Sequence, residues 1–267
     1  HRALQPLDAM VAPIEIRPLV TEFNQVLDRL EQAADAQQRF VANAAHQLRT
    51  PLAGVRTQLE LLQRDSDPGQ RSARAEQCIG AIERLGHLVN QMLVLLSAEP
   101  GGRHASLAEA LELSDLIRER SPDWIRLAEG RAIDLGFDLH TARVTGDRLL
   151  LGEMVANLVI NAIHYTPAQG EVTVRCHTAE GHSIIEVEDN GPGIPPALRE
   201  HVFERFFRLP GVSGPGSGLG LAIVREIARG ADGDVDILTP ATGRGSLLRV
   251  RLPAIQPAAD GEGVKKS

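Results

Sequence analysis

Aromatic side chains are scarce in this 267-residue chain, at 3% of all residues, and cysteine occurs only twice. A core with so few rings has to be built mostly from Leu, Val, Ile and Ala, which favours helices. Cys78 and Cys176 lack metal-ligand spacing, so we expect reduced, buried thiols in a cytosolic setting. No apolar run approaches the roughly 18 residues that cross a bilayer, and we recognise no signal peptide.

A surplus of basic residues is also missing, because the net charge is −7. Nucleic-acid binding demands a basic face, so the sequence predicts no nucleic-acid partner. The hydrophobic content of 43% and charged content of 24% are ordinary for a globular protein. The length favours two domains joined by linkers.

The first third of the chain has the apolar spacing of two long helices. Three prolines before residue 19 exclude a long helix there. A first seam follows in steps of three and four: Val20, Phe23, Leu27, Leu30, Ala34, Val41, Ala45, Leu48, Leu52, Val55, Leu59 and Leu62. After a turn at 65–69, a second seam comprises Cys78, Ile82, Leu85, Val89, Met92 and Leu96. The pattern predicts a helical hairpin, and a homodimer that closes a four-helix bundle would cover its bare face.

The rest of the chain alternates between helix and strand patterns. The residues 99–102 (EPGG) predict a linker, and the polar residues 258–267 predict a disordered tail. Between them we expect helices at 111–129, 146–165 and 219–229, and strands at 132–139, 171–177, 183–188, 235–238 and 246–252. The strands at 171–177 and 183–188 should form a hairpin around Glu180-Gly181. The fold class is therefore a helical hairpin followed by an α/β sandwich.

His46 stands in the run FVANAAHQLRTPL, on the side of its helix away from the seam. Arg49 and Thr50 follow one turn later and should project near the ring. Pro51 cannot donate to the carbonyl of Gln47, which predicts either a tolerated kink or a local hinge. An exposed histidine is commonplace on helices, so this helix alone leaves its role open.

The run HQLRTPL resembles the H-box of two-component sensor histidine kinases. The resemblance implies that His46 is the phosphoacceptor and that Thr50 positions the water that hydrolyses the phosphorylated partner. The family usually has Glu or Asp directly after the histidine, whereas this chain has Gln47. An amide oxygen can accept a hydrogen bond and fix the imidazole tautomer, but it cannot take a proton.

Four later segments resemble, in order, the nucleotide site of the GHKL (Bergerat) type. The first is NLVINAIHY, in which Asn157 and Asn161 lie four residues apart on one helix face. The resemblance implies that these asparagines hold phosphate oxygens and Mg²⁺, with Asn161 as the metal ligand. It also implies a phosphate contact for His164, where lysine is commoner, and packing of Tyr165 against adenine.

The second segment is DNGPGI, at the end of an apolar strand. Asp189 could accept a hydrogen bond from the adenine amino group, and the glycines would let the backbone approach the base. The implied nucleotide-binding residues are Asp189, Gly191, Gly193 and Ile194. The same letters also make a good turn, so this segment alone is only moderately specific.

The third segment, FERFFR, resembles the F-box, whose aromatics would anchor an ATP lid at residues 195–217. Here Arg205 and Arg208 could meet phosphates. The fourth, GSGLGLAIV, leads into a helix N-terminus that attracts phosphate, with Gly216, Gly218, Leu219 and Gly220 as the binding residues. Ser246 belongs to the closing segment, where threonine is commoner. Each segment has an ordinary alternative, and their order makes the set specific.

The expected domains are a HAMP-like end and coiled-coil linker (1–38), a dimerisation and phosphotransfer domain (39–98), a linker (99–105), a catalytic ATP-binding domain (106–255) and a tail (256–267). The resemblance implies Mg-ATP as cofactor, autophosphorylation of His46 and transfer to an aspartate of a response regulator receiver domain. It places this piece on the cytoplasmic face of the bacterial inner membrane, within a membrane-anchored full-length protein. Two alternatives stay open: another GHKL ATPase of the mismatch-repair or chaperone type, and a non-catalytic ATP-binding dimeric scaffold.

Overall fold

The computed structural model describes Leu7, Pro13 and residues 15–64, 67–97, 108–211 and 216–255. Its chain separates into two compact units, residues 1–86 and residues 87–267. The expected linker at 99–102 and the expected tail at 258–267 lie outside the described residues. None of the described helices is long and apolar enough to cross a bilayer.

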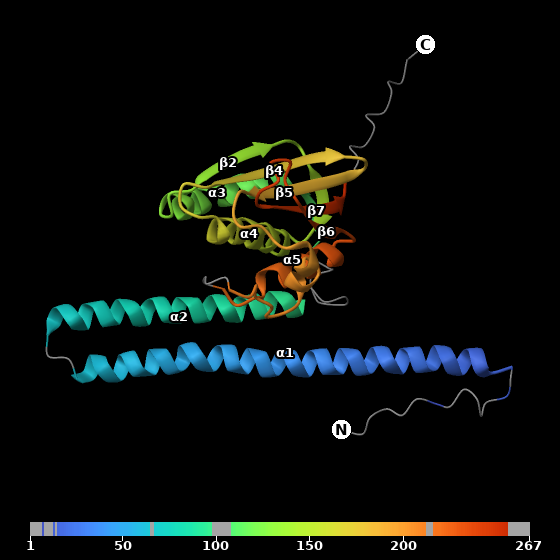
Figure 1. Ribbon diagram of the computed structural model, residues 1–267, viewed down its shortest axis with the longest axis horizontal. Helices are drawn as coiled ribbons and strands as arrows, with labels where there is room; N and C mark the ends of the chain where they lie inside the picture. The colour runs from blue at the N-terminus through green and yellow to red at the C-terminus, as the bar shows by residue number, and fades with distance from the viewer. Residues whose placement is uncertain are drawn as a thin grey trace, which may run out of the picture. The chain divides into compact units, whose positions relative to one another are not determined.

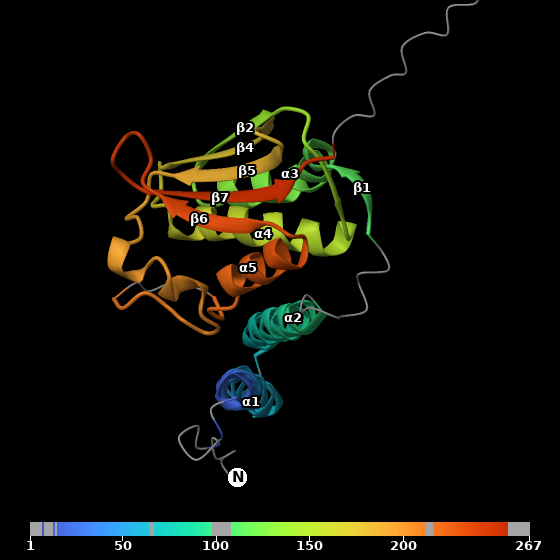
Figure 2. The same ribbon diagram turned by 90° about the vertical axis from the view of Figure 1, so that its right-hand side faces the viewer.

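Two long helices occupy the first part of the chain, as the apolar spacing predicts. They are α1 (Arg17–Arg64) and α2 (Pro68–Ser97), which lie antiparallel and side by side (Figures 1 and 2). Because α1 begins at Arg17, Pro18 falls in its first turn, where the missing backbone N–H has no helical partner to lose. The first helix ends at Arg64 and the second begins at Pro68, so the break between them falls within the predicted range 65–69.

Pro51 lies inside α1, and the helix continues through it to Arg64. The proline is therefore tolerated within a regular helix, where it leaves the Gln47 carbonyl without its usual donor. A hinge at this position stays a prediction.

The predicted seam of α1 separates into two stripes around His46. Leu48, Val55 and Leu62 are half-buried, whereas Val41, Leu52 and Leu59 are 59%, 52% and 47% exposed. In α2, Cys78 is buried while Ile82 is 55% exposed, so the same division recurs there. One hairpin thus shields only half of its apolar positions, and an apolar stripe is left bare.

The second unit contains a five-stranded sheet with helices on one face, which confirms the α/β sandwich (Figure 2). The strand order is β2-β4-β5-β7-β6, in which β2 is parallel to β4 and the other neighbours are antiparallel. The strands are β2 (Asp134–Leu139), β4 (Glu171–Ala179), β5 (His182–Asp189), β6 (Asp234–Leu238) and β7 (Ser246–Pro253). The covering helices are α3 (Leu113–Glu129), α4 (Arg148–Tyr165) and α5 (Gly220–Gly230).

Period-two alternation places one side of each strand in the core. Val174, Ile185 and Val250 are 0% exposed, as are Leu158 of α4 and Ile223 of α5 on the helical side. The opposite face of the sheet carries cross-strand ion pairs instead, such as Arg249 Nε with Glu186 Oε1 at 2.7 Å. The predicted hairpin turn between β4 and β5 is confirmed: Glu180 and Gly181 have φ of 51° and 76°, as a tight hairpin turn requires.

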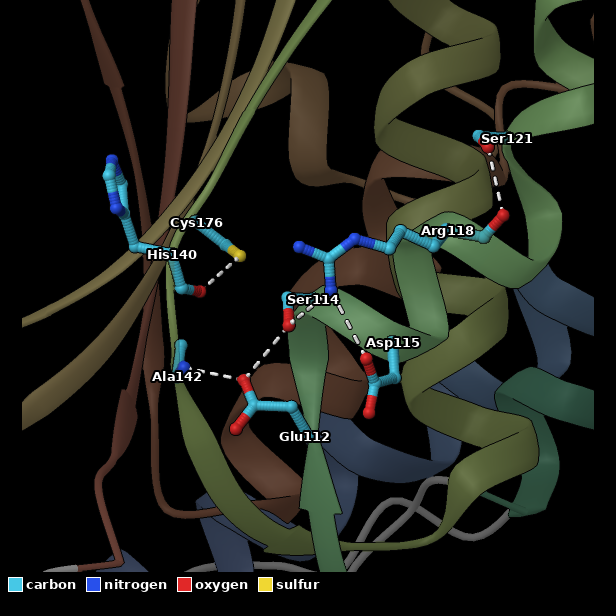
Figure 3. Close-up of polar contacts among 8 residues, drawn as sticks. All are labelled: Glu112, Ser114, Asp115, Arg118, Ser121, His140, Ala142 and Cys176. Carbon is cyan, nitrogen blue, oxygen red and sulfur yellow. Dashed lines mark hydrogen bonds and ion pairs between the residues drawn. The ribbon is translucent and has the colours of Figure 1, made fainter.

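The predicted helix start at Leu111 is wrong, because Leu111 belongs to a short strand, β1 (Glu109–Glu112). This strand pairs with β3 (Arg143–Gly146), which the sequence pattern missed. Figure 3 shows the junction: the Glu112 carboxylate accepts hydrogen bonds from the Ala142 backbone N–H at 2.6 Å and from Ser114 Oγ at 3.2 Å. These bonds hold Glu112 against the neighbouring strand, so α3 begins only at Leu113.

Cys176 of β4 lies beside this junction, and its thiol donates to the carbonyl of His140 at 3.1 Å (Figure 3). Burial raises the pKa of the Cys176 thiol to about 11, so the thiolate is not populated at neutral pH. Cys78 is buried as well. Both cysteines are therefore buried free thiols, as predicted.

Candidate nucleotide site and phosphoacceptor

The phosphoacceptor candidate His46 lies near the middle of α1 with an exposed side chain, and so do Gln47 and Arg49. The Thr50 hydroxyl donates to the carbonyl of His46 at 3.3 Å. Thr21 and Thr57 make the same bond four residues back along α1, so this is an ordinary arrangement for a helical threonine. A role for Thr50 near the imidazole therefore requires its side chain to rotate.

Helix α4 carries the two asparagines and starts at a well-formed cap. The Asp147 carboxylate accepts from the backbone N–H groups of Leu149 and Leu150 at 2.7 and 3.2 Å. One turn before the C-terminal end of the helix, Asn161 is half-buried. Asn157 is 8% exposed, and its amide donates to the carbonyl of Glu153 at 2.8 Å. The buried apolar residues between them fix α4 against the sheet.

The N-terminal end of α5 packs directly on these asparagines. A Cβ added to Gly220 would lie 3.0 Å from Asn157 Oδ1 and 3.1 Å from Asn161 Nδ2. The fold thus brings the first and fourth predicted segments together, although they are some sixty residues apart in sequence. Free N–H groups at the start of a helix, beside two amide side chains, form a suitable environment for phosphate oxygens.

Two glycines of the loop before α5 have backbone conformations that other residues rarely adopt. Gly216 and Gly218 have φ of 143° and 73°, which favours glycine at both. Leu219 is completely buried, so its side chain belongs to the core, and only its backbone can reach a ligand. The Leu219 N–H donates to Ser217 Oγ, within the loop itself, at 3.2 Å.

Gln91, near the end of α2, belongs to the same unit and contacts both segments. Its amide nitrogen lies 3.3 Å from Asn157 Oδ1, and its amide oxygen accepts from Ser217 Oγ at 2.8 Å. Gln91 is 8% exposed. Sequence reasoning missed this residue, because its position in the second seam resembles that of any polar neighbour of apolar residues.

The opposite end of the candidate site is built around Asp189, at the end of β5. Its carboxylate is 6% exposed and accepts the backbone N–H groups of Gly191, at 2.9 Å, and of Ser246. Burial raises the pKa of Asp189, and the two hydrogen bonds oppose that shift only in part. A buried carboxylate at a strand end is suited to accept a hydrogen bond from a base.

Three glycines around Asp189 have no room for a side chain. A Cβ on Gly191 would lie 2.9 Å from both Asp189 Oδ1 and the carbonyl of Tyr165. Gly193 has φ of 76°, and a Cβ there would lie 2.8 Å from the carbonyl of Gly245. Gly245, which precedes Ser246 in the closing segment, has no space for any side chain because a Cβ would lie 1.7 Å from the Asp189 carbonyl. The DNGPGI turn, the end of α4 and the start of β7 therefore meet at one place.

The F-box forms no amphipathic helix. Its first residue, Phe203, ends the 3₁₀ helix η3 (His201–Phe203), is buried and lies under the Arg225 guanidinium, 3.9 Å from the ring centroid. The Phe206 N–H donates to the carbonyl of Gly218 at 2.8 Å, which joins the F-box to the glycine-rich loop. Arg205 is half-buried and Arg208 is exposed. Residues 212–215 of the expected lid lie outside the described part of the chain.

His164 and Tyr165, at the end of α4, are half-buried. Burial, reinforced by the nearby charge of Arg131, lowers the pKa of His164. At neutral pH this ring is therefore uncharged, and it differs in charge from the lysine that is commoner at the position. A phosphate contact through His164 would be a hydrogen bond from a neutral imidazole.

Residues 36–101 match the His Kinase A (phospho-acceptor) domain, and residues 146–256 match the histidine kinase-, DNA gyrase B-, and HSP90-like ATPase family. The chain is 37% identical to the sensor protein kinase PmrB of Pseudomonas aeruginosa, over 97% of this chain and 54% of PmrB. It is 39% identical to the sensor protein QseC of Salmonella typhi, over 84% of this chain and 49% of QseC.

Among solved structures, the histidine kinase ThkA in complex with the response regulator protein TrrA has a TM-score of 0.62 and 21% sequence identity. The alignment covers 85% of this chain and 66% of ThkA, and it shows a shared fold. The chain spans about half the length of the curated relatives it matches. The chain has a phosphoacceptor domain followed by an ATPase domain, and its relatives are sensor kinases. It therefore belongs to the family of sensor histidine kinases.

Proposed function

We propose that this protein is an ATP-dependent histidine kinase that phosphorylates His46 and passes the phosphoryl group to an aspartate of a response regulator. The observation that carries the proposal is the meeting of four separate segments at α4, β5 and α5, in a chain that also presents an exposed H-box histidine. Asn157 and Gly220 would face the phosphates, while Asp189 would accept from the adenine amino group. ThkA, a protein of the same fold, has been crystallised with a response regulator, which supports that class of partner.

Mg²⁺ would join the nucleotide at Asn161. Within the described ranges, no group of three or more His, Cys, Asp or Glu residues could hold a metal ion. Mg²⁺ needs few protein ligands, since it retains waters and binds substrate phosphates. One amide oxygen beside the start of α5 fits that requirement, and the ion would neutralise charge on the phosphates.

The reaction would form a bond between an imidazole nitrogen of His46 and the γ-phosphorus while the bond from that phosphorus to the ADP oxygen breaks. The ring becomes positively charged and then loses its second N–H proton. Gln47 has no basic site for that proton, so water would accept it. Charge neutralisation and positioning would supply most of the rate, as in other phosphoryl transfers.

Incubation with γ-labelled ATP tests the proposal. The protein should acquire a label that is stable in alkali and lost in acid, and His46→Gln should abolish it. The matched control is His87→Gln, which changes another exposed histidine of the same chain and should leave the label intact. Label that survives in His46→Gln would refute His46 as the phosphoacceptor. ATP hydrolysis without any label would favour the GHKL ATPase alternative, and ATP binding with neither label nor hydrolysis would favour the scaffold.

The bare stripe on the helices supports a homodimer. A partner hairpin would cover Val41, Leu52, Leu59 and Ile82, each about half exposed in one chain. Leu59→Glu should shift the protein toward monomer in sedimentation analysis, whereas Gln63→Glu, an exposed polar position on α1, should not. A monomeric wild-type chain at all concentrations would contradict the dimer.

We infer the same setting for the full-length protein as for sensors of this family. PmrB and QseC are both named as sensors, and this chain spans about half of each. The kinase would then lie on the cytoplasmic face of a bacterial inner membrane, below a sensing part, and it could also act as a phosphatase toward its regulator through Thr50. Membrane fractionation of the full-length protein, and dephosphorylation assays with Thr50→Ala, test these two points.

A further inference from the structure

Arg131 contacts the C-terminal end of α4, although it lies in the turn after α3. It follows α3, and its side chain extends to α4, where Nε donates to the carbonyl of Ile163 and Nη2 donates to the carbonyl of His164, each at 3.1 Å. The last four carbonyls of a helix have no partner within it. The Ala162 carbonyl already accepts from the Thr166 N–H at 3.0 Å. Arg131 thus supplies donors to the next two carbonyls of α4.

The backbone next to Arg131 makes a second connection to the same region. The carbonyl of Ala132 accepts from the Gln169 N–H at 2.6 Å, which joins the turn after α3 to the turn after α4. Both residues have positive φ, 53° for Ala132 and 64° for Gln169. Two tight turns with strained backbones are therefore held together at this point, and the Arg131 side chain is part of that junction.

The charge of Arg131 also suits its position. A cation near a helix C-terminus is stabilised by the negative end of the helix dipole. A guanidinium is planar and can donate to two carbonyls at once, whereas an ammonium cannot match that fork. The nearby charge reinforces burial in lowering the pKa of His164, so the fixed positive charge at this end of α4 belongs to Arg131.

The turn that Arg131 caps leads directly into the candidate nucleotide site. His164 and Tyr165 are its side chains, and the Tyr165 carbonyl lies so close to Gly191 that a Cβ there would be at 2.9 Å. A displacement of this turn would therefore move the loop that follows Asp189. Asn157 lies two turns earlier in α4, bonded to Glu153 within the helix, and would be affected less.

We propose that Arg131 is a positioning residue for nucleotide binding: its guanidinium caps α4 and fixes the turn that carries His164 and Tyr165. The inference rests on the proposed nucleotide site. Without the cap, the last turn of α4 frays, and only a fraction of molecules holds the binding geometry. The apparent dissociation constant rises in inverse proportion to that fraction, while turnover in the occupied site is preserved.

The test uses the full 267-residue chain with Arg131→Met, which removes the fork and the charge, and Arg131→Lys, which keeps the charge alone. Arg126→Met is the matched control, because Arg126 is an exposed residue of α3 that pairs with Asp123. We expect Arg131→Met to weaken ATP binding and raise KM about three- to tenfold, with kcat for autophosphorylation within about twofold. Arg131→Lys should recover part of the affinity, and Arg126→Met should match the wild type.

The titration of His164, followed by NMR in the nucleotide-free protein, is a readout that general loss of stability does not imitate. Its pKa should rise in Arg131→Met, because a nearby positive charge is lost, and stay low in Arg131→Lys. Unchanged ATP affinity in Arg131→Met, a fall in kcat with unchanged KM, or an unchanged His164 pKa would each overturn the inference.

Two further outcomes are separable. If Arg131→Met fails to fold, as judged by circular dichroism, Arg131→Lys decides, and wild-type affinity in that variant overturns the inference. If the wild-type protein binds no ATP, the proposed function fails, whereas the His164 titration needs no nucleotide and still reports on the Arg131 contact.

Discussion

Gln47 departs from the usual residue pattern of the family, which has Glu or Asp directly after the histidine. The side chain is exposed on α1 next to His46, so a carboxylate at this position would meet water rather than a buried surface. In the proposed reaction this residue leaves water as the acceptor of the imidazole proton.

Gln47→Glu restores a proton acceptor next to the ring. We expect the autophosphorylation rate to stay the same or to rise, by up to roughly tenfold, because a carboxylate can both hold the tautomer and take the proton. Single-turnover labelling measures the rate. Gln38→Glu is the control, since it adds the same charge at an exposed position of α1. A large loss of rate in Gln47→Glu alone would reveal a specific role for the amide.

The Asp189 carboxylate lowers the stability of the fold at neutral pH, while the proposed ATP binding requires it. Burial raises the pKa of Asp189, so the folded state binds a proton more readily than the unfolded state does. Its contribution to stability therefore falls as pH rises from the ordinary aspartate pKa of 3.8 through the raised pKa of the folded state. At neutral pH the buried charge is unfavourable for folding.

Asp189→Asn should therefore keep or raise the melting temperature at pH 7. It should weaken ATP binding by roughly 100-fold or more, because the amide has a single accepting oxygen, whereas the carboxylate can accept from the Gly191 and Ser246 N–H groups and from the adenine amino group together. Thermal denaturation and calorimetric titration measure the two effects. Asp236→Asn, which changes a half-exposed carboxylate paired with Arg251 on the other face of the sheet, should leave ATP affinity unchanged. A strong loss of stability in Asp189→Asn would contradict this account.

At the scale of elements, α3 is followed by an alanine in a left-handed conformation that favours glycine. Ala132 has φ of 53°, and the Ile133 N–H returns to the Ala128 carbonyl at 3.0 Å, which is the usual closure of a helix by a left-handed residue. Glycine is the favoured residue there, yet Gly130 stands two positions earlier with φ of −62°.

Ala132→Gly should stabilise the ATPase unit by about 0.5–1 kcal/mol, because it removes the Cβ from a left-handed position. Chemical denaturation checks the value. Ala128→Gly, in the helical part of α3, is the control and should destabilise the unit by about 1 kcal/mol. Equal effects of the two substitutions would mean that Ala132 is not strained.

The elements that could be predicted from the sequence are those with many residues in phase. The two long helices, the β4–β5 hairpin and β7 all have spacing that persists over several turns or pleats. Strands β1 and β3 have four residues each, too few for alternation to stand out, and Glu112 ends β1 through a contact with Ala142 that no local pattern encodes. For Pro51 the sequence is compatible with a tolerated kink or a hinge, and the helix continues through it.

The candidate site divides in the same way. Asn157, Asp189 and Gly220 belong to motifs, and the structure brings their segments together. Gln91 and Arg131 were missed because their roles depend on partners far along the chain, Asn157 and the end of α4. Leu219 was assigned to the site from its motif, and its side chain lies in the core.

At the scale of the whole molecule, the two compact units should unfold separately in calorimetry. The helical unit should melt at a temperature that rises with protein concentration, as expected for a dimer, and the ATPase unit should not. ATP at 100 times its dissociation constant should stabilise the ATPase unit alone by about 2.7 kcal/mol, roughly 5–10 °C in melting temperature. A single transition that ATP and concentration both shift would mean that the units fold cooperatively.

The continuity of α1 has a consequence for the direction in which the His46 side chain points. A helix turns by about 100° per residue, so a continuous helix from Arg17 to Arg64 fixes the azimuth of His46 relative to both ends. A twist applied at the N-terminal end is then transmitted along the whole helix, and it changes the direction in which the imidazole faces. Rotation of the whole helix can therefore redirect the imidazole without breaking any helical hydrogen bond.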